Sequence, residues 1–299
     1  MSVKSPQAGI YKEGSKHFYF LEYHFKKSNL SEIKQVLSES LPTSDSTSVV
    51  VSFGKAAWQL LQPNWQPATL ESFTTIKGLQ GHEAPSTQAD LFFWVHGVGI
   101  SEVYDAAMSI HAHMQSVAEL SLQERGFDYH NSQDLIGFED GTANPKTVEL
   151  RKAATVIPDG LSGAGGCLVL SQKWVHDLDK WHHTPVHCQE AIVGRTKVEN
   201  IELEGDAMPD DSHVSSTDLT VDGVPMKIYR RSAPFGSMTE KGLLFLAFGC
   251  DLLRFSSQLE TMYGLGDTQK IDQLINFSKA VTGSYWFAPS QEDLAEILS

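Results

Sequence analysis

The first half of the chain alternates between strand-like and helix-like spacing of its apolar residues. Residues 17–25 are aromatic and alternate apolar with polar side chains, which predicts a β-strand. Apolar residues recur every three or four positions within 30–37 and, most clearly, within 103–117, which predicts two helices. Further strands are expected at 46–54, 89–97 and 127–129. Strand, helix, strand, strand, helix, strand is the order of a ferredoxin-like domain.

The second half repeats this pattern without repeating the sequence. Strands are expected at 165–175, 225–231 and 241–249, and helices at 177–197 with a break at Pro185, at 251–264 and at 268–281. Residues 198–217 are polar, acidic and irregular. A chain of 299 residues is also long for one compact domain. We therefore predict an α+β protein of two ferredoxin-like domains, residues 1–134 and 135–299, each a four-stranded antiparallel sheet with helices on one face.

Composition and charge narrow the class of partner. With 41% hydrophobic and 20% charged residues the chain has a globular composition. A net charge of -14 disfavours nucleic acid and anionic membranes as general partners, although it leaves room for a local basic pocket. The three cysteines share no metal-ligand spacing and indicate a reduced, intracellular chain. The N-terminus has no apolar signal core and no stretch reaches membrane-spanning length, so we expect a cytoplasmic protein.

Three short stretches carry candidate chemistry, each with a simpler structural interpretation. In LIGFEDGTANP, Asp140 lies among glycines, where most aspartates serve the turn itself. His213 stands alone in a polar loop, and most such histidines are merely solvated or hydrogen-bonded. In KIYRRSAPFG, Arg230 and Arg231 point to opposite faces of the expected strand, and an inward-facing arginine needs an anion or a carboxylate beside it. The residues alone favour structural ion pairs.

Taken together, these stretches resemble a known family. GFEDGTANP, GGCLVLSQKWVHDLDKW, IVGRTKVENIEL, DSHVSSTDL, KIYRRSAPFG and DQLINFSKAVTGSYWFAPS resemble, in the same order, the landmarks of the dye-decolorizing peroxidases. The resemblance extends from about Gly9 to the end of the chain and is best from Gly137 to Pro289. The compact length is similar to that of the bacterial cytoplasmic branch of the family.

The resemblance implies a haem b peroxidase with haem in the C-terminal domain. Such an enzyme uses hydrogen peroxide to oxidise aromatic donors and dyes through a ferryl (compound I) intermediate. His213 matches the proximal iron ligand, Asp140 the distal acid and Arg230 the distal arginine. The glycines beside Asp140 are then expected to let the backbone run close over the porphyrin face.

The same resemblance implies roles for three further residues. Asp272 matches the carboxylate that accepts a hydrogen bond from the ligand histidine, with Asp251 as the alternative. Arg195 matches a partner of a haem propionate. Ser232 stands where many relatives carry an asparagine, and a serine hydrogen-bonds with shorter reach.

An apolar wall is expected on the distal side of the haem. The alternating side chains of Leu244, Leu246 and Phe248 are candidates for it, and plain core packing is an equally good interpretation of that strand. Bulky dyes are expected to give up electrons at the protein surface, through aromatic relays that the sequence leaves open. The candidate relays are Trp58, Trp65, Tyr129, Trp174, Trp181 and Tyr229.

Two other functions compete with a peroxidase. A protein that binds, stores or delivers haem or its iron also needs His213, but it does not need Asp140 and Arg230, so their presence favours the enzyme. A divalent-metal protein using EGDAMPDD explains none of the landmarks. The family resemblance also implies a homodimer or larger homo-oligomer. Recruitment to an encapsulin shell is not expected, because the chain stops at EDLAEILS, directly after its last landmark.

Overall fold

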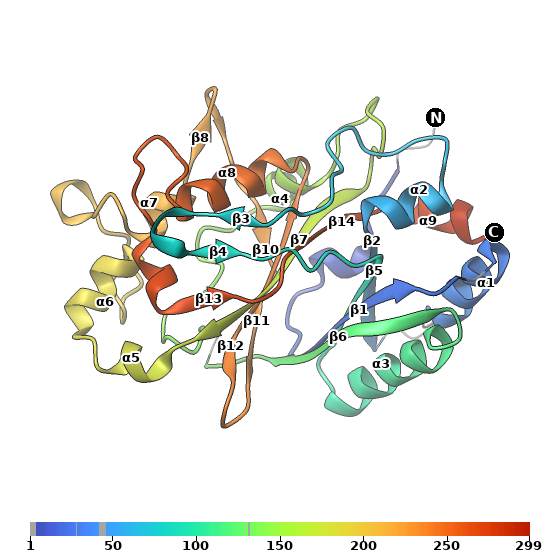
Figure 1. Ribbon diagram of the computed structural model, residues 1–299, viewed down its shortest axis with the longest axis horizontal. Helices are drawn as coiled ribbons and strands as arrows, with labels where there is room; N and C mark the ends of the chain where they lie inside the picture. Colours follow the sequence, from blue (N-terminus) through green and yellow to red (C-terminus); the bar gives the residue numbers. More distant parts are fainter. Residues whose placement is uncertain (1–3, 28, 42–45, 131) are drawn as a thin grey trace.

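The computed structural model describes residues 4–27, 29–41, 46–130 and 132–299 (Figure 1). Within these residues one antiparallel sheet runs through the molecule in the strand order β10-β12-β7-β14-β2-β5-β1-β6, with β11 beside β12 and β13 beside β7. Each half of that order comes from one half of the chain. The sheet is therefore built from two units that pair edge to edge.

The N-terminal unit, on the right of Figure 1, has the ferredoxin-like order β2-β5-β1-β6. Its strands are β1 (His17–Phe25), β2 (Thr47–Phe53), β5 (Leu91–Gly97) and β6 (Ala118–Phe127), and its long helices are α1 (Leu30–Ser40) and α3 (Ile100–Met114). The helices pack their apolar side chains on one face of the sheet, with Ile33 and Ile110 fully buried. The helix α1 begins at Asn29, whose side chain accepts a hydrogen bond from the Ser31 backbone amide.

The C-terminal unit repeats this order, as β10 and β11, β12, β7 and β14. Its strands are β7 (Cys167–His176), β10 (Tyr229–Arg230), β11 (Ala233–Gly236), β12 (Lys241–Gly249), β13 (Ser278–Ala280) and β14 (Ser284–Ala288). Its helices are α4 (Val148–Thr155), α5 (Leu178–His182), α6 (Val186–Val193), α7 (His213–Thr217) and α8 (Leu253–Met262). The prediction of an α+β protein with two ferredoxin-like units is confirmed.

Short elements complete the chain. They are the helices α2 (Lys55–Leu61) and α9 (Gln291–Leu298), the two-residue strands β3 (Ile76–Lys77), β4 (Glu83–Ala84), β8 (Thr220–Val221) and β9 (Val224–Pro225), and the 3-10 turns Ala8–Tyr11, Leu79–Gly81, Gly205–Ala207 and Gln273–Asn276. The β3–β4 hairpin reaches from the N-terminal half over the C-terminal unit, where the Leu79 amide donates to the carbonyl of Tyr263. None of the helices in the described ranges is long and apolar enough to cross a membrane.

The two units join through one strand pair and share a core. Phe287 of β14 pairs with Phe53 of β2, which makes the sheet continuous. Strands β7 and β1 are not neighbours in the sheet, yet Ser171 of β7 donates a hydrogen bond to Glu22 of β1 over 3.1 Å. This contact shows that the sheet curves back on itself. The space enclosed between the units is filled by buried aromatic and aliphatic side chains, among them Phe20, Phe92, Trp94, Leu246, Phe248 and Trp286. The boundary predicted at 134/135 stays a prediction.

Three predicted elements differ from the structure. The last strand of the first unit is Ala118–Phe127, not 127–129, because its side chains alternate between exposed and half-buried positions and give only a weak apolar pattern. The helix predicted at 268–281 is wrong: a 3-10 turn at Gln273–Asn276 leads into β13, which pairs with β7. The stretch predicted to be irregular contains the short helix His213–Thr217.

Candidate active site

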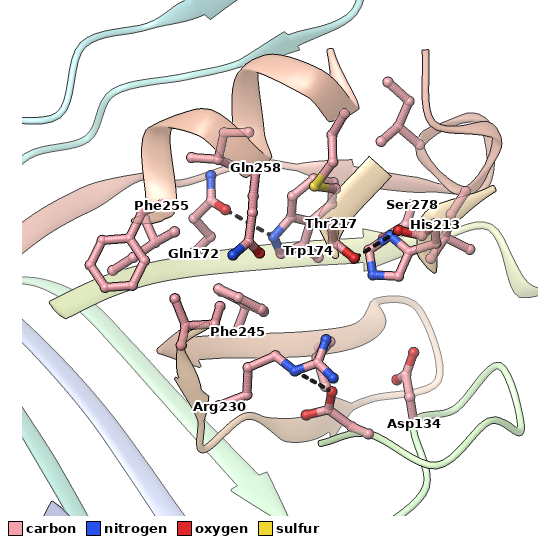
Figure 2. A pocket seen from close by; sticks show the side chains of 18 of the residues that line it. Asp134, Gln172, Trp174, His213, Thr217, Arg230, Phe245, Phe255, Gln258 and Ser278 are labelled. Atoms are coloured by element: carbon pink, nitrogen blue, oxygen red, sulfur yellow. Dashed lines mark hydrogen bonds and ion pairs between the residues drawn. The ribbon is translucent and has the colours of Figure 1, made fainter. Parts of the chain in front are cut away.

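A deep cavity lies in the C-terminal unit between the sheet and the helices α7 and α8 (Figure 2). An adjoining space shares Asp134, Asp140, His213 and Arg230 with it. Two joined spaces with a mainly apolar lining and a few polar groups are typical of a site for an organic ligand. The apolar lining consists of Leu170, Trp174, Ile228, Leu243, Phe245, Phe255, Leu259, Met262, Leu274 and Ile275.

His213 projects into the cavity from the start of α7. Ser212 caps this helix by accepting a hydrogen bond from the Ser215 amide. The Nδ1–H of His213 donates to Oδ2 of Asp272 over 2.6 Å, and Asp272 is fully buried. Nε2 of His213 has no hydrogen-bond partner within the described residues. The imidazole therefore has one nitrogen fixed by a carboxylate and the other free to bind a metal.

The structure places Asp272, rather than the alternative Asp251, at this histidine. The second oxygen of Asp272 accepts from the Leu274 amide over 2.8 Å, so the carboxylate also caps the 3-10 turn that replaces the predicted helix. Asp251 instead accepts from the Leu253 amide at the start of α8. The carboxylate beside His213 is thus held from two directions, which fixes the tautomer of the imidazole.

Asp140 and Arg230 lie on the opposite side of the cavity from His213. Figure 2 shows Arg230 reaching up from one side while His213 lies on the other. Nε of Arg230 is 3.6 Å from Oδ1 of Asp140, and each side chain keeps about a fifth of its surface exposed, at 17% and 22%. The pair is close enough to attract and too loose for a strong hydrogen bond, so both groups keep free positions for a small molecule.

The turn that carries Asp140 is fixed by backbone conformation and by Asn144. Gly137 and Gly141 have φ values of +86° and +77°, a region that side chains other than glycine rarely adopt. The side chain of Asn144 donates to the carbonyl of Arg230 over 2.9 Å and accepts from its amide over 2.8 Å. A Cβ on Gly141 would lie 2.8 Å from the Asn144 amide nitrogen. The glycines are therefore needed to make the turn and to seat Asn144.

Arg195 lines the adjoining space and is already bonded there. Its Nε donates to the Asn200 side chain over 2.9 Å, and its two terminal nitrogens donate to the Asn200 carbonyl and to Glu202, over 2.8 and 2.7 Å. A guanidinium carries five N–H donors, so two remain for an anion. This leaves the predicted propionate contact open to Arg195.

The predicted apolar wall lies on the other face of its strand. Leu244, Leu246 and Phe248 are fully buried in the core between the two units and do not line the cavity, which corrects the prediction for all three. Leu243 and Phe245 line it instead. Side chains alternate along a strand, so assigning the wrong face to β12 moves the whole set by one residue. Ser232 accepts a long hydrogen bond, 3.5 Å, from the Leu246 amide.

Besides the contact between His213 and Asp272, the cavity wall contains a second buried set of hydrogen bonds, which the sequence does not predict. Nε2 of His176 lies 3.1 Å from Oδ2 of Asp134, and Nδ1 lies 2.8 Å from Oγ of Ser278. All three line the cavity. Their positions at the end of β7, before the Asp140 turn and at the start of β13 share no spacing that marks them as partners.

Comparison with known proteins decides the family. A model described as Dyp-type peroxidase, C-terminal, matches residues 131–293, and one described as Dyp-type peroxidase, N-terminal, matches residues 38–128. The chain belongs to the Dyp-type peroxidase family. The dye-decolorizing peroxidase of Mycobacterium tuberculosis is 34% identical to it over 271 residues, which cover 89% of this chain and 80% of that peroxidase.

Solved structures of the family superpose on the whole chain. DypB from Rhodococcus jostii RHA1, solved as a variant in complex with heme, has a TM-score of 0.91 at 30% identity, covering 99% of this chain and 100% of that one. A dye-decolorizing peroxidase from Bacteroides thetaiotaomicron has a TM-score of 0.89 at 27% identity, covering 99% of both chains. The chain is therefore an enzyme of the peroxidase class, and the expectation drawn from its landmarks is confirmed at that level.

Proposed function

We propose that this peroxidase binds haem b in the cavity, between His213 on one side and Asp140 and Arg230 on the other, and uses hydrogen peroxide to oxidise aromatic donors. One observation supports this above all. An imidazole with a free Nε2, fixed by a buried carboxylate, faces a carboxylate and a guanidinium across an apolar space. Fixed imidazole, apolar walls and polar groups on the far side are what a haem site requires.

The lining residues divide the binding of haem among them. Nε2 of His213 would bind the iron, and the apolar side chains from β7, β12 and α8 would pack against the porphyrin. Arg195, at the polar end of the adjoining space, would bind a propionate. Bound haem supplies the electrons that reduce peroxide and recovers them from the donor.

Asp140 is the proton-handling group of the proposal. Its carboxylate takes the proton from one oxygen of hydrogen peroxide and returns it to the other oxygen as that oxygen departs. Its partly exposed position lets it accept and release a proton without leaving a charge fully buried. The backbone amide of Asp140 donates to the carbonyl of Ser132 over 3.0 Å, which holds the turn in place during the transfer.

Arg230 stabilises the negative charge that builds up on the departing oxygen. A guanidinium carries a delocalised positive charge and several N–H donors. The double hydrogen bond from Asn144 to the Arg230 backbone fixes the origin of the side chain, so the charge is in position before the oxygens separate.

Stopped-flow absorption spectroscopy of haem-loaded protein mixed with hydrogen peroxide at acid pH tests the proposal. We expect a transient spectrum that an aromatic dye returns to the resting one within seconds. A spectrum that only bleaches would favour a haem-handling protein instead. Failure to take up haem stably would contradict the assignment of His213. Homo-oligomer formation, cytoplasmic location and the absence of encapsulin recruitment stay predictions.

A further inference from the structure

Arg231 follows Arg230 directly in the chain, and the proposed function does not use it. Its guanidinium lies between two aromatic rings, with its central carbon 5.2 Å from the ring centre of Trp94 and 5.6 Å from that of Tyr229. Its terminal nitrogens donate to the Tyr229 hydroxyl over 2.9 Å and to the Lys12 carbonyl over 2.6 Å. No carboxylate in the described residues lies within ion-pair distance of it. A half-buried guanidinium without an anion is unusual.

This arginine lines a third cavity, which opens beside Asp140 and Arg230. The cavity shares Asp140, Arg230 and Leu243 with the two spaces described above. Four aromatic side chains contribute to its lining: Phe18, Phe127, Tyr129 and Tyr229. A ligand here would touch aromatic surface while lying next to the two residues that handle peroxide.

Among the charged side chains that line this cavity, cations outnumber carboxylates. Each of its three carboxylates already has a cation: Glu13 pairs with Arg151 over 2.8 Å, Asp128 with Lys16 over 2.5 Å, and Asp140 with Arg230 over 3.6 Å. Two lining cations remain without a carboxylate in the described part of the chain, Lys146 and Arg231. Lys146 donates to the carbonyl of Thr142. On a chain whose net charge is -14, this is a local excess of positive charge.

The same positive charge affects the pKa of a neighbouring histidine, His96. His96 is buried and stacks on Trp94, the ring that Arg231 also contacts. Burial, followed by the positive charges of Arg231 and Lys12, lowers the pKa of His96 to about 3. His96 therefore stays neutral at any working pH and adds no cation beside Trp94, whose ring Arg231 contacts.

We propose that this third cavity binds the reducing substrate as an aromatic carboxylate, such as a phenol that carries a carboxylate group. The carboxylate would pair with Arg231, and the ring would lie against the aromatic lining, next to Asp140 and Arg230. A planar guanidinium matches a carboxylate in geometry, and the aromatic walls favour a ring over a small inorganic anion. This inference rests on the proposed peroxidase function and names the donor class for it.

The chemistry balances for a phenol of this kind. Two phenol molecules each give one electron and one hydroxyl proton, and become phenoxyl radicals. One hydrogen peroxide takes up both electrons and both protons, its O–O bond breaks, and two water molecules form. Asp140 lies in the lining of the same cavity, so the proton released by the phenol has a carboxylate close at hand.

Binding of a redox-inert probe to the haem-loaded protein tests the site directly. We expect benzoate to bind at least about tenfold more tightly than benzamide, its neutral counterpart, by isothermal titration calorimetry. Arg231→Gln should remove this preference and Arg231→Lys should keep part of it. Lys55→Gln, which removes one positive charge from α2 in the other unit, is the matched control and should change nothing. Equal binding of the two probes, or an unchanged preference in Arg231→Gln, would overturn the proposal.

Two further measurements separate this inference from the proposed function. In turnover, Arg231→Gln should raise the KM for 4-hydroxybenzoate relative to that for its methyl ester by about tenfold. If no donor is turned over while benzoate still binds through Arg231, the peroxidase proposal fails and the anion site stands. If sulfate displaces benzoate with the affinity of benzoate itself, the cavity recognises any anion, and the aromatic part of the proposal is wrong.

Discussion

On the side of His213, one short hydrogen bond of 2.6 Å joins the imidazole to a fully buried carboxylate, whereas Asp140 and Arg230 on the opposite side lie 3.6 Å apart and partly exposed. After the roles proposed for them, we call these the ligand side and the peroxide side. The ligand side fixes one geometry, as a metal ligand would require. The peroxide side leaves its groups accessible, as they would need to be for hydrogen peroxide to enter, react and leave. One wall of the cavity is thus rigid, and the opposite wall is accessible.

The largest effect is expected on the ligand side. His213→Ala removes the nitrogen proposed to bind iron, so haem affinity should fall by more than about 100-fold, beyond the loss typical of an outer partner. Absorption titration with haem measures it. His183→Ala, an exposed histidine in the same unit, is the control. Unchanged ligation in His213→Ala would refute the assignment.

On the peroxide side the expected effect is on rate alone. Asp140→Asn and Arg230→Ala should each retain haem and slow the reaction with peroxide by roughly two to four decades, the range for acid–base and electrostatic groups. Stopped-flow mixing gives the rate. If neither single change slows the reaction, the double variant decides whether the two residues replace one another or the site lies elsewhere.

The carboxylate of the ligand side should have a smaller effect. Asp272→Asn weakens the acceptor for His213 Nδ1–H, so haem affinity should fall by about 10–100-fold and the reduction potential should rise. Potentiometric and haem titrations follow the two quantities. Asp251→Asn is the matched control, because Asp251 also caps a local backbone amide but does not contact His213. If the two changes had equal effects, the loss of haem affinity would come from the lost backbone cap and not from the contact with His213.

The smallest effect is expected for Asn144, whose side chain holds the backbone of Arg230 on the peroxide side. Asn144→Ala removes two hydrogen bonds to the Arg230 backbone, so the peroxide reaction should slow by about tenfold while haem affinity is kept, since two bonds contribute about 1–3 kcal/mol. Asn29→Ala, which removes a helix cap in the other unit, controls for stability. A drop in haem affinity would show that the two sides are coupled.

The sequence predicted the two sides unequally. Asp140, His213, Arg230 and Asp272 were identified by resemblance. The structure brings Asp140, His213 and Arg230 to one cavity and places Asp272 behind His213. The face predicted for β12 was wrong, because both faces of this strand carry apolar residues and no polar alternation marks the side that lines the cavity. The contacts of His176 with Asp134 and Ser278 exist only once three distant segments are folded together. Periodicity describes neighbours along the chain, and these contacts are made across it.

The pairing of β2 with β14 has a consequence for synthesis on the ribosome. Phe53 is made well before its partner Phe287, with about 230 residues between them, which a ribosome adds in roughly ten to fifty seconds. During that time the first unit has an unpaired strand edge and the uncovered aromatic surface of the shared core. Nascent chains are therefore exposed to association with one another, and chaperones that shield such edges should raise the yield of this peroxidase more than that of a single-unit protein.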